Sequence, residues 1–527
     1  MEIDKEYGGI RSFEVHGYFV SRLKAFVAAF LFVSFLIAVV VLAALLAHEK
    51  SKGDITGVSG NQAGNQESHV KQMTCNVVVV GGGISGLYMA ETLMRLKKEN
   101  NVCLFEKDSR FGGRNYDVRF KQAPNISINL GSWRVDKKNK RVMDLARRLN
   151  IPMLSIGKLT DIFFQARGVR AYTFQSLKEK AFPTLMSGPF SNMTWLEMYL
   201  FAWRNMTKEK ALEFPFYRDF MCERLGSEGC ELLYARYVDK RDFYEESTLD
   251  KYENDEAVSY FSYDFYKPRG GISDITTALK ISAQRFGAKL VLKEKINALE
   301  RKADGFDVHT DHFKVSAKKL IIAVPTLPFE AIRGDVAADV KSNVLFGSIP
   351  GANAFKAVAI YSSPWWEDYL PKRNRTEPIV ETFWSASTCL VLVPYNGRGP
   401  QGEAIIQLSY AWLGCAAKWG KMSELPRSIF EAEIKKAVQE VFPDKVVPDP
   451  LDMVFKFWDK VAWHETKAGS NVSRHDVKKW AKRPFPGEEI YLVGEAFSLQ
   501  VGWNEGALSS AYNALEEGWE ISDPETN

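Results

Sequence analysis

The sequence lacks the patterns of a metal site, with no C-x-x-C pair, no H-E-x-x-H motif and no histidines and carboxylates at metal-ligand spacing. A bound metal is therefore not expected. Net charge is also scarce, because 69 lysines and arginines nearly balance 65 aspartates and glutamates over 527 residues. This balance argues against a nucleic-acid-binding protein. The densest basic cluster has helical spacing and is predicted to be a solvated helix face. It comprises Lys137, Lys138, Lys140, Arg141, Arg147 and Arg148.

Cysteines are few as well, six in all. Two local disulfides are expected from sequence proximity, Cys222 with Cys230 and Cys389 with Cys415. Cys75 and Cys103 fall in predicted buried strands, where we expect them to be small apolar core residues.

One long run without charge lies near the start of the chain, at residues 25–47. As a helix it would measure about 35 Å, enough for a hydrocarbon core of roughly 30 Å. It is longer than the apolar region of a cleaved signal peptide, so we predict a signal anchor. Arg11, Arg22 and Lys24 precede the run, whereas the basic residues after it are mixed with acidic ones. The N-terminus is therefore predicted to be cytosolic.

Beyond this run, residues 51–71 are rich in Gly, Ser, Asn and Gln and have no apolar periodicity, as is typical of a flexible stalk. Five N-x-S/T sequons follow, at Asn125, Asn192, Asn205, Asn374 and Asn471. Together they suit a glycosylated body outside the cytosol. We therefore expect a single-pass type II membrane protein with an extracellular or lumenal body.

The most informative motif is VVVVGGGISGLYMAETLMRL, residues 77–96, an apolar β-branched run that turns through glycines into a helix. Gly81 allows a tight turn, Gly83 lets a pyrophosphate approach the backbone, and Gly86 lets helix and strand pack closely. The helix N-terminus adds unpaired N–H groups. Glu106 ends the next predicted strand, where its carboxylate can accept the ribose hydroxyls. The combination predicts a dinucleotide site.

The rest of the chain indicates an α/β protein of at least two units. Residues 141–149 are predicted to form a helix, and the aromatic-rich residues 151–256 have mostly helical spacing. Residues 270–287 are a predicted helix followed by short strands, and strands are expected at 355–361 and 403–410. Helices at 426–441 and 506–518 complete the pattern.

Four separated motifs then resemble those of the flavin-containing amine oxidase family, which includes monoamine, polyamine and L-amino-acid oxidases. They are GGGISG, RFGGR, KLIIAVP and YLVGEAFSLQVGWNEGALSSA, and the resemblance covers residues 74 to 520. It implies a Rossmann-type FAD-binding domain interleaved with an α+β substrate domain that carries a helical insertion. The expected boundaries are a tail at 1–24, the anchor at 25–47, the stalk at 48–72, an FAD-binding domain at 73–133, 265–330 and 485–527, and a substrate domain at 134–264 and 331–484.

The resemblance also assigns the cofactor. Arg114 and the adjacent glycine amides suit a pyrophosphate, since arginine makes bidentate phosphate contacts. By resemblance, Glu495 holds the ribityl and pyrophosphate region and the backbone of Ile296 meets the adenine. Monoamine oxidases have a cysteine where this chain has Gly469, Ser470 and Asn471, so FAD is expected to be non-covalent.

Lys356 stands in an apolar strand, where desolvation eases its deprotonation. In the family, the matching lysine holds a water against flavin N5 and assists the reaction with oxygen. Trp503 matches one wall of an aromatic cage over the flavin. Trp463 resembles the tryptophan of the glycine turn along the isoalloxazine, although one residue is missing from the usual spacing.

The substrate prediction depends on Arg134 and Tyr410. In L-amino-acid oxidases, an arginine at the position of Arg134 pairs with the substrate carboxylate, and a tyrosine in a substrate-domain strand completes the clamp. An arginine buried in a nearly closed cavity implies an anionic partner. The amine of the bound amino acid would lie near the Gly502 carbonyl and Trp503. Trp133 departs from the family pattern at this place.

The expected reaction is hydride transfer from the Cα of an L-amino acid to flavin, giving an imino acid that hydrolyses to a keto acid and ammonia. Oxygen would regenerate the flavin and yield hydrogen peroxide. Three alternatives remain open at this point: a polyamine or monoamine oxidase of the same fold, a non-catalytic FAD-binding cell-surface module, and a desaturase or flavin monooxygenase.

Overall fold

The structure, a computed structural model, describes residues 70–235, 246–258, 264–370, 379–385 and 388–525. The predicted tail and anchor, nearly all of the stalk and the sequon at Asn374 lie outside these ranges. Within the described ranges, no helix is both long enough and apolar enough to cross a membrane.

The first of two large sheets holds the glycine turn. Its strands, in order, are β10 (Ile296–Lys302), β11 (Gly305–Thr310), β12 (Phe313–Ile322), β1 (Lys71–Val80), β2 (Val102–Glu106) and β9 (Lys289–Leu292), and β18 (Ile490–Leu492) pairs with β12. β1 is parallel to both of its neighbours. The parallel strands explain the uninterrupted valine run, because both faces of such a sheet are covered.

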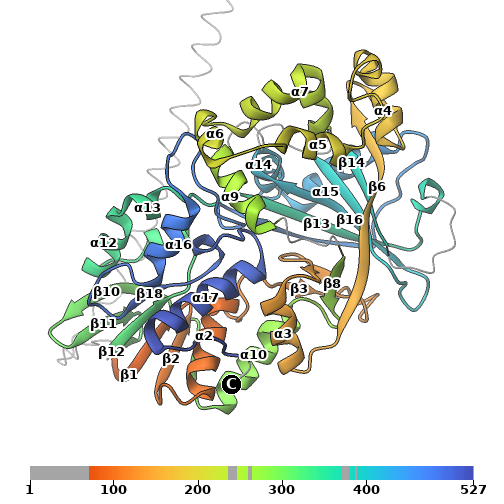
Figure 1. Cartoon of the computed structure of the whole chain (residues 1–527). Helices are drawn as coiled ribbons and strands as arrows, with labels where there is room; N and C mark the ends of the chain where they lie inside the picture. Colours follow the sequence, from red (N-terminus) through yellow and green to blue (C-terminus); the bar gives the residue numbers. More distant parts are fainter. Residues whose placement is uncertain (1–69, 236–245, 259–263, 371–378, 386–387, 526–527) are drawn as a thin grey trace, which may run out of the picture. The chain divides into compact units, whose positions relative to one another are not determined.

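Helices cover the two faces of this sheet. One face packs on α2 (Ile84–Arg95), α3 (Lys140–Arg148), α10 (Ser273–Arg285) and α17 (Asn504–Trp519). The other face packs on α11 (Thr326–Glu330), α12 (Asp335–Ser342), α13 (Val344–Gly347) and α16 (Arg474–Lys482). Figure 1 shows α2, α10 and α17 together on one side of the strands. Val77 and Val79 belong to the first core and Val78 and Val80 to the second, as the two-residue period of a strand requires.

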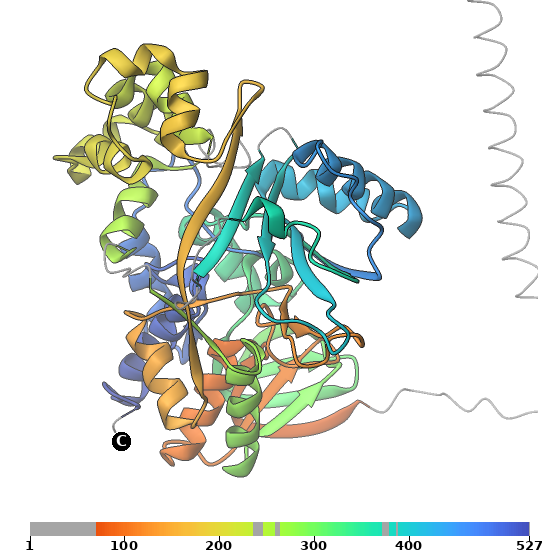
Figure 2. The ribbon, with the colours of Figure 1, turned by 90° about the vertical axis from the view of Figure 1, so that its right-hand side faces the viewer.

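The second sheet is mostly antiparallel. Its order is β17 (Asp452–Trp458), β13 (Ala354–Tyr361), β16 (Ala404–Trp412), β15 (Leu390–Pro394), β14 (Ile379–Ser385), β6 (Met153–Ala166), β8 (Phe265–Pro268) and β5 (Val135–Asp136), and β7 (Val169–Ala171) pairs with β6. One face packs on α14 (Leu413–Met422) and α15 (Arg427–Val441), which lie beside the strands in Figure 2. On the other face, Val358 and Ile360 pack against a segment that contains β3 (Asp117–Val118) and β4 (Ile128–Asn129).

A helical segment with its own core follows β7. It comprises α4 (Phe174–Ala181), η1 (Pro183–Ser187), α5 (Trp195–Trp203), α6 (Lys208–Glu213), α7 (Tyr217–Tyr234) and α9 (Thr248–Val258). The expectation of mostly helical structure from residue 151 onward is wrong for its first part, where β6 and β7 lie. Phe163 packs in the core of the second sheet and Phe164 in that of the helical segment. At these two residues both faces of the strand are buried, so the stretch lacks the alternation that identifies strands in a sequence.

All six cysteines form disulfides. The bridges Cys222–Cys230 and Cys389–Cys415 are as predicted. Cys75 and Cys103, expected to be unpaired core residues, form a third. These two residues lie in the neighbouring strands β1 and β2, where their Cα atoms are 6.0 Å apart. The correction follows from strand adjacency, which brings two buried side chains together.

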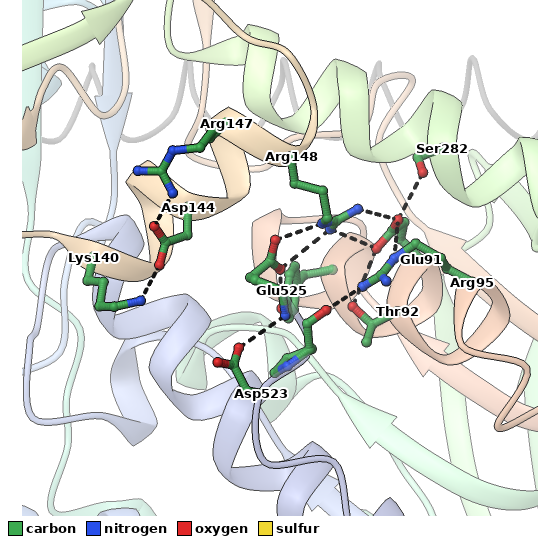
Figure 3. A network of polar contacts seen from close by, with 12 residues as sticks. Glu91, Thr92, Arg95, Lys140, Asp144, Arg147, Arg148, Ser282, Asp523 and Glu525 are labelled. Carbon is green, nitrogen blue, oxygen red and sulfur yellow. Dashed lines mark hydrogen bonds and ion pairs between the residues drawn. The ribbon is translucent and has the colours of Figure 1, made fainter. Parts of the chain in front are cut away.

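The basic cluster on α3 is only partly a solvated face. Lys140 and Arg147 are exposed and pair with Asp144, but Arg148 points into the protein. Its guanidinium binds Glu91 of α2 at 2.8 Å and Glu525 near the C-terminus at 2.7 Å (Figure 3). A buried network thus ties α2 and α3 to the end of the chain.

Removal of Glu91 should destabilise the protein strongly. The side chain of Glu91 is fully buried, and its carboxylate also accepts hydrogen bonds from Arg95 at 3.1 Å and Ser282 at 2.9 Å. Glu91→Ala leaves two partly buried guanidinium groups without this partner, and loss of one member of a buried ion pair costs about 3–5 kcal/mol. Denaturant unfolding measures the change. Asp144→Ala is the matched control, because its partners are exposed; an equal loss for both variants would contradict the interpretation.

Candidate active site

A cavity of about 630 Å³ runs from the glycine turn of the first sheet to the second sheet. Its walls come from the β1–α2 turn, the end of β2, residues 112–115, 131–132, 294–296, 323–328 and 461–463, the strands β13, β16 and β17, and residues 493–504. Of the predicted site residues, all line this cavity except Gly86 and Arg134.

Each of the three positions in the turn requires glycine for a different physical reason. Gly81 has φ +102°, and a Cβ there would lie 2.7 Å from the carbonyl oxygen of Ala323. A Cβ on Gly86 would lie 2.1 Å from the carbonyl oxygen of Gly81, so helix and strand could not pack. A Cβ on Gly83, by contrast, would meet nothing within 4 Å. Packing explains Gly81 and Gly86, whereas the open space at Gly83 suits the close approach of a ligand.

Polar groups around this turn suit a dinucleotide. Gly83 caps α2 without a side-chain hydrogen bond, so N–H groups of the first turn remain available to an anion. Glu106 is buried, and its carboxylate accepts the backbone N–H of Gly82 at 2.7 Å and of Asp108 at 2.9 Å. These bonds fix the carboxylate at the cavity wall. Ile296 begins β10 and is buried at the same end.

Glu495 connects three separate segments. Its Oε1 accepts hydrogen bonds from Arg114 at 2.6 Å and from Nδ1 of His464 at 2.5 Å, and its Oε2 accepts the N–H of Gly502 at 3.0 Å. Burial opposes its charge, but His464 and Arg114 hold the pKa of this carboxyl well below its usual range. Arg114 and Glu495 were predicted as separate cofactor contacts; the structure places them in one ion pair.

Two residues behind Glu495 were missed in the sequence. His464 is fully buried beside Trp463, and Arg474 is fully buried behind it. Arg474 donates hydrogen bonds to the carbonyl oxygens of His464 at 2.6 Å and Ala496 at 3.0 Å, and it pairs with Asp250 of α9 at 3.0 Å. The helical segment is thereby joined to the turn at Glu495. No local pattern signals these contacts, since the partners are far apart in sequence.

Lys356 lines the cavity, and its strand β13 lies between two neighbouring strands. It is opposite Tyr410 of β16 on one side and opposite Lys456 of β17 on the other. Its Nζ donates a hydrogen bond to the carbonyl oxygen of Gly131 at 2.6 Å and stands 4.5 Å from the ring centroid of Tyr410. Burial and the nearby charge of Arg134 lower its pKa to about 7, and Asp117 opposes this shift.

Arg134 is surrounded by aromatic rings. Its guanidinium carbon lies 4.4 Å from the ring centroid of Phe265, 4.7 Å from Trp133 and 5.8 Å from Trp503. Trp503 is among the residues that line the cavity, and Arg134 is not. Burial raises the pKa of Tyr410 and the charge of Arg134 opposes that shift, so these two side chains interact. The structure therefore brings Arg134, Tyr410 and Trp503 together near Lys356.

The remaining predicted residues are adjacent to one another. Gly502 has φ +75°, and a Cβ there would lie 3.4 Å from the Cβ of Trp463. Trp463 and Trp503 both line the cavity. This pair of indole rings can exclude water from one end of the cavity.

Comparisons with known proteins show what the chain is similar to. A family model described as flavin containing amine oxidoreductase matches residues 84–516. Aplysianin-A of Aplysia kurodai is 21% identical over 88% of this chain and 94% of its own length. Amine oxidase [flavin-containing] B of Homo sapiens is 22% identical, and the match covers 56% of this chain and 59% of that protein. A putrescine oxidase solved with putrescine has a similar fold, with a TM-score of 0.60 and 17% identity over 86% of this chain and 100% of that chain.

Proposed function

Because the chain belongs to the flavin containing amine oxidoreductases, and so to the FAD-dependent oxidoreductases that act on CH–NH2 donors, we propose that its substrates are L-amino acids. The products would be a keto acid, ammonia and hydrogen peroxide. The observation that carries this proposal is that Arg134 stands close enough to Tyr410 and Lys356, two residues that line the cavity, for its charge to act on both. A carboxylate fits such a cationic end, whereas the ammonium groups of simple amines do not.

The cavity fits FAD by its own chemistry. The N-terminus of α2, the unobstructed Gly83 and Arg114 suit the pyrophosphate, and Glu106 suits the ribose. Ile296 lies where the adenine end is expected. When bound, FAD supplies two-electron redox chemistry between a C–N bond and molecular oxygen. We propose that it is held non-covalently.

The side chains of this protein then have separate tasks in the proposed reaction. Arg134 and the hydroxyl of Tyr410 bind the substrate carboxylate and orient the molecule. Trp463 and Trp503 exclude water. Lys356, with a pKa of about 7, can hold or release a proton at its Nζ near neutral pH. Glu495 orients the turn that carries Gly502.

A polyamine or monoamine oxidase is the second candidate, and the surroundings of Arg134 favour it. Three aromatic rings within 6 Å already stabilise the guanidinium by cation–π contacts. With these contacts Arg134 has a structural role that requires no substrate carboxylate. The two candidates therefore differ in what Arg134 binds.

A peroxide-release assay separates them. The purified full chain, loaded with FAD, is tested against the common L-amino acids, spermine and phenylethylamine. We expect peroxide and an equal amount of ammonia from at least one L-amino acid, because the cationic end binds its carboxylate. Turnover of spermine or phenylethylamine without turnover of any amino acid would refute the proposal.

We also propose that the body of the protein is anchored by residues 25–47 and faces an oxidising compartment. Three disulfides suit such a compartment. The four sequon asparagines within the described ranges are all exposed, as glycan attachment requires; they are Asn125, Asn192, Asn205 and Asn471.

Glycosidase treatment of the protein from secretory cells tests this topology. Removal of N-linked glycans should increase electrophoretic mobility, and exchange of all five sequon asparagines for glutamine should abolish that shift. Protease added to intact microsomes should leave the body protected. An unglycosylated, protease-accessible body would contradict the proposed orientation.

A further inference from the structure

A second lysine faces the cavity beside Lys356. Lys456 of β17 is the direct cross-strand partner of Lys356, and Tyr410 is its partner on the other side. All three side chains line the cavity. Residues directly opposite one another on neighbouring strands project from the same face of a sheet. The three residues therefore form a row, in the order Tyr410, Lys356 and Lys456.

Lys456 differs from Lys356 in its partners. Lys356 donates a hydrogen bond to Gly131, whereas the Nζ of Lys456 lies 5.2 Å from the ring centroid of Trp458. Among the described residues, no carboxylate pairs with Lys456 and no acceptor receives a hydrogen bond from it. Trp458 is held in place, because its indole N–H donates to the carbonyl oxygen of Leu130 at 2.7 Å. A half-buried ammonium group on a fixed ring is thus presented to the cavity.

The row separates two cationic positions. The charge of Arg134 acts on Tyr410 and Lys356, and Lys456 stands at the far end of the row. Neighbouring strands are about 4.8 Å apart, so the backbones at Tyr410 and Lys456 are roughly 10 Å apart. If one carboxylate binds at Arg134 and Tyr410, the ammonium of Lys456 is left for a second anionic group on the same molecule.

We infer that Lys456 binds the side-chain carboxylate of an acidic L-amino acid, so that the enzyme prefers L-glutamate or L-aspartate over their amides. This inference rests on the proposed L-amino-acid oxidase function. Lys456 is then a specificity-determining residue, and Arg134 and Tyr410 bind the α-carboxylate.

Binding of non-reactive acids tests the inference without turnover. Glutarate and valerate have chains of equal length but two carboxylates and one carboxylate respectively, and their binding is followed by the change in the flavin absorbance of the holoenzyme. We expect glutarate to bind about tenfold more tightly than valerate. Lys456→Met should abolish this difference. The matched control is Lys418→Met, because Nζ of Lys418 also lies 5.2 Å from an indole ring, that of Trp419, but outside the cavity lining.

Turnover provides the second measurement. The wild-type enzyme should have a KM for L-glutamate about tenfold below that for L-glutamine, which has nearly the same shape without the charge. Lys456→Met should bring the two KM values together, and Lys418→Met should leave their ratio as it is. FAD affinity of each variant is measured in parallel by equilibrium dialysis.

The outcomes are distinguishable. If neither acid perturbs the flavin, or if Arg134→Met leaves valerate binding unchanged, the proposed function fails and the inference with it. If valerate binding depends on Arg134 but glutarate binds no more tightly, only the inference is overturned. It is also overturned if Lys456→Met weakens FAD binding and leaves the glutarate-to-valerate ratio intact, since Lys456 would then serve the cofactor phosphates.

Discussion

Replacement of Arg134 by methionine raises the KM for L-amino acids about 100-fold and lowers kcat far less, if the proposed carboxylate clamp is correct. Loss of a charge-assisted pair with a desolvated carboxylate costs about 3 kcal/mol, which corresponds to that factor. Methionine keeps an apolar stem against Trp133 and Phe265, the rings that Arg134 contacts. The measurement is steady-state kinetics on the best amino acid from the peroxide assay.

Arg141→Met is the control for this variant. Arg141 also combines a ring contact, 5.1 Å from Tyr512, with an ion pair to Glu505, but it stands on α3, and the charge that acts on Tyr410 and Lys356 is that of Arg134. Its replacement should leave KM unchanged. An unchanged KM in Arg134→Met as well would show that Arg134 binds no substrate carboxylate and would favour the amine oxidase alternative.

Replacement of Lys356 by methionine should remove a pH-dependent step. Above pH 7 the amine of Lys356 is mostly neutral and can accept a proton, and below pH 7 it is mostly protonated. We therefore expect kcat to rise as the pH increases through about 7 in the wild type. In Lys356→Met, kcat should fall about 100-fold and this limb of the profile should disappear, because general base assistance contributes factors of this order.

Lys356→Arg separates proton transfer from charge. Arginine keeps a positive charge but does not deprotonate in this pH range. A variant that stays slow at every pH supports a neutral amine as the acting form, whereas wild-type activity in Lys356→Arg would contradict it.

The same pKa shift has a consequence for stability. The folded pKa of about 7 lies below the ordinary lysine value of 10.5, so the unfolded chain binds the additional proton between these two pH values. The stability of the wild type relative to Lys356→Met should therefore rise with pH across this window. Thermal unfolding of both proteins at pH 7 and pH 10 measures the difference. A constant difference would show that Lys356 is not desolvated in the folded state.

The glycine turn could be predicted from sequence because its physics is local. The conformation of Gly81, the contact at Gly86 and the strand that ends at Glu106 all arise within 30 residues. The same holds for the amphipathic helices α3, α10, α15 and α17, whose periodicity is visible in the chain. Family membership followed from four separated motifs and is confirmed by the match over residues 84–516.

Contacts between distant segments could not be predicted in this way. The row of Tyr410, Lys356 and Lys456 depends on the register of three strands, and a shift of one residue would turn each side chain to the other face. The burial of Arg148 depends on Glu91 and Glu525, which no helical pattern on α3 reveals. The disulfide Cys75–Cys103 is a different case, since the predicted strand–helix–strand unit already implied that its two strands are neighbours.

The three hydrogen bonds to Glu495 keep this part of the cavity wall intact at mildly acidic pH. A carboxyl with a depressed pKa contributes stability that is lost only as the pH falls through its folded pKa, which here is well below the ordinary range. Arg114, His464 and the Gly502 turn therefore stay joined in mildly acidic surroundings. As the pH falls, the charge of Lys356 would therefore change near pH 7, well before the carboxylate of Glu495 is protonated.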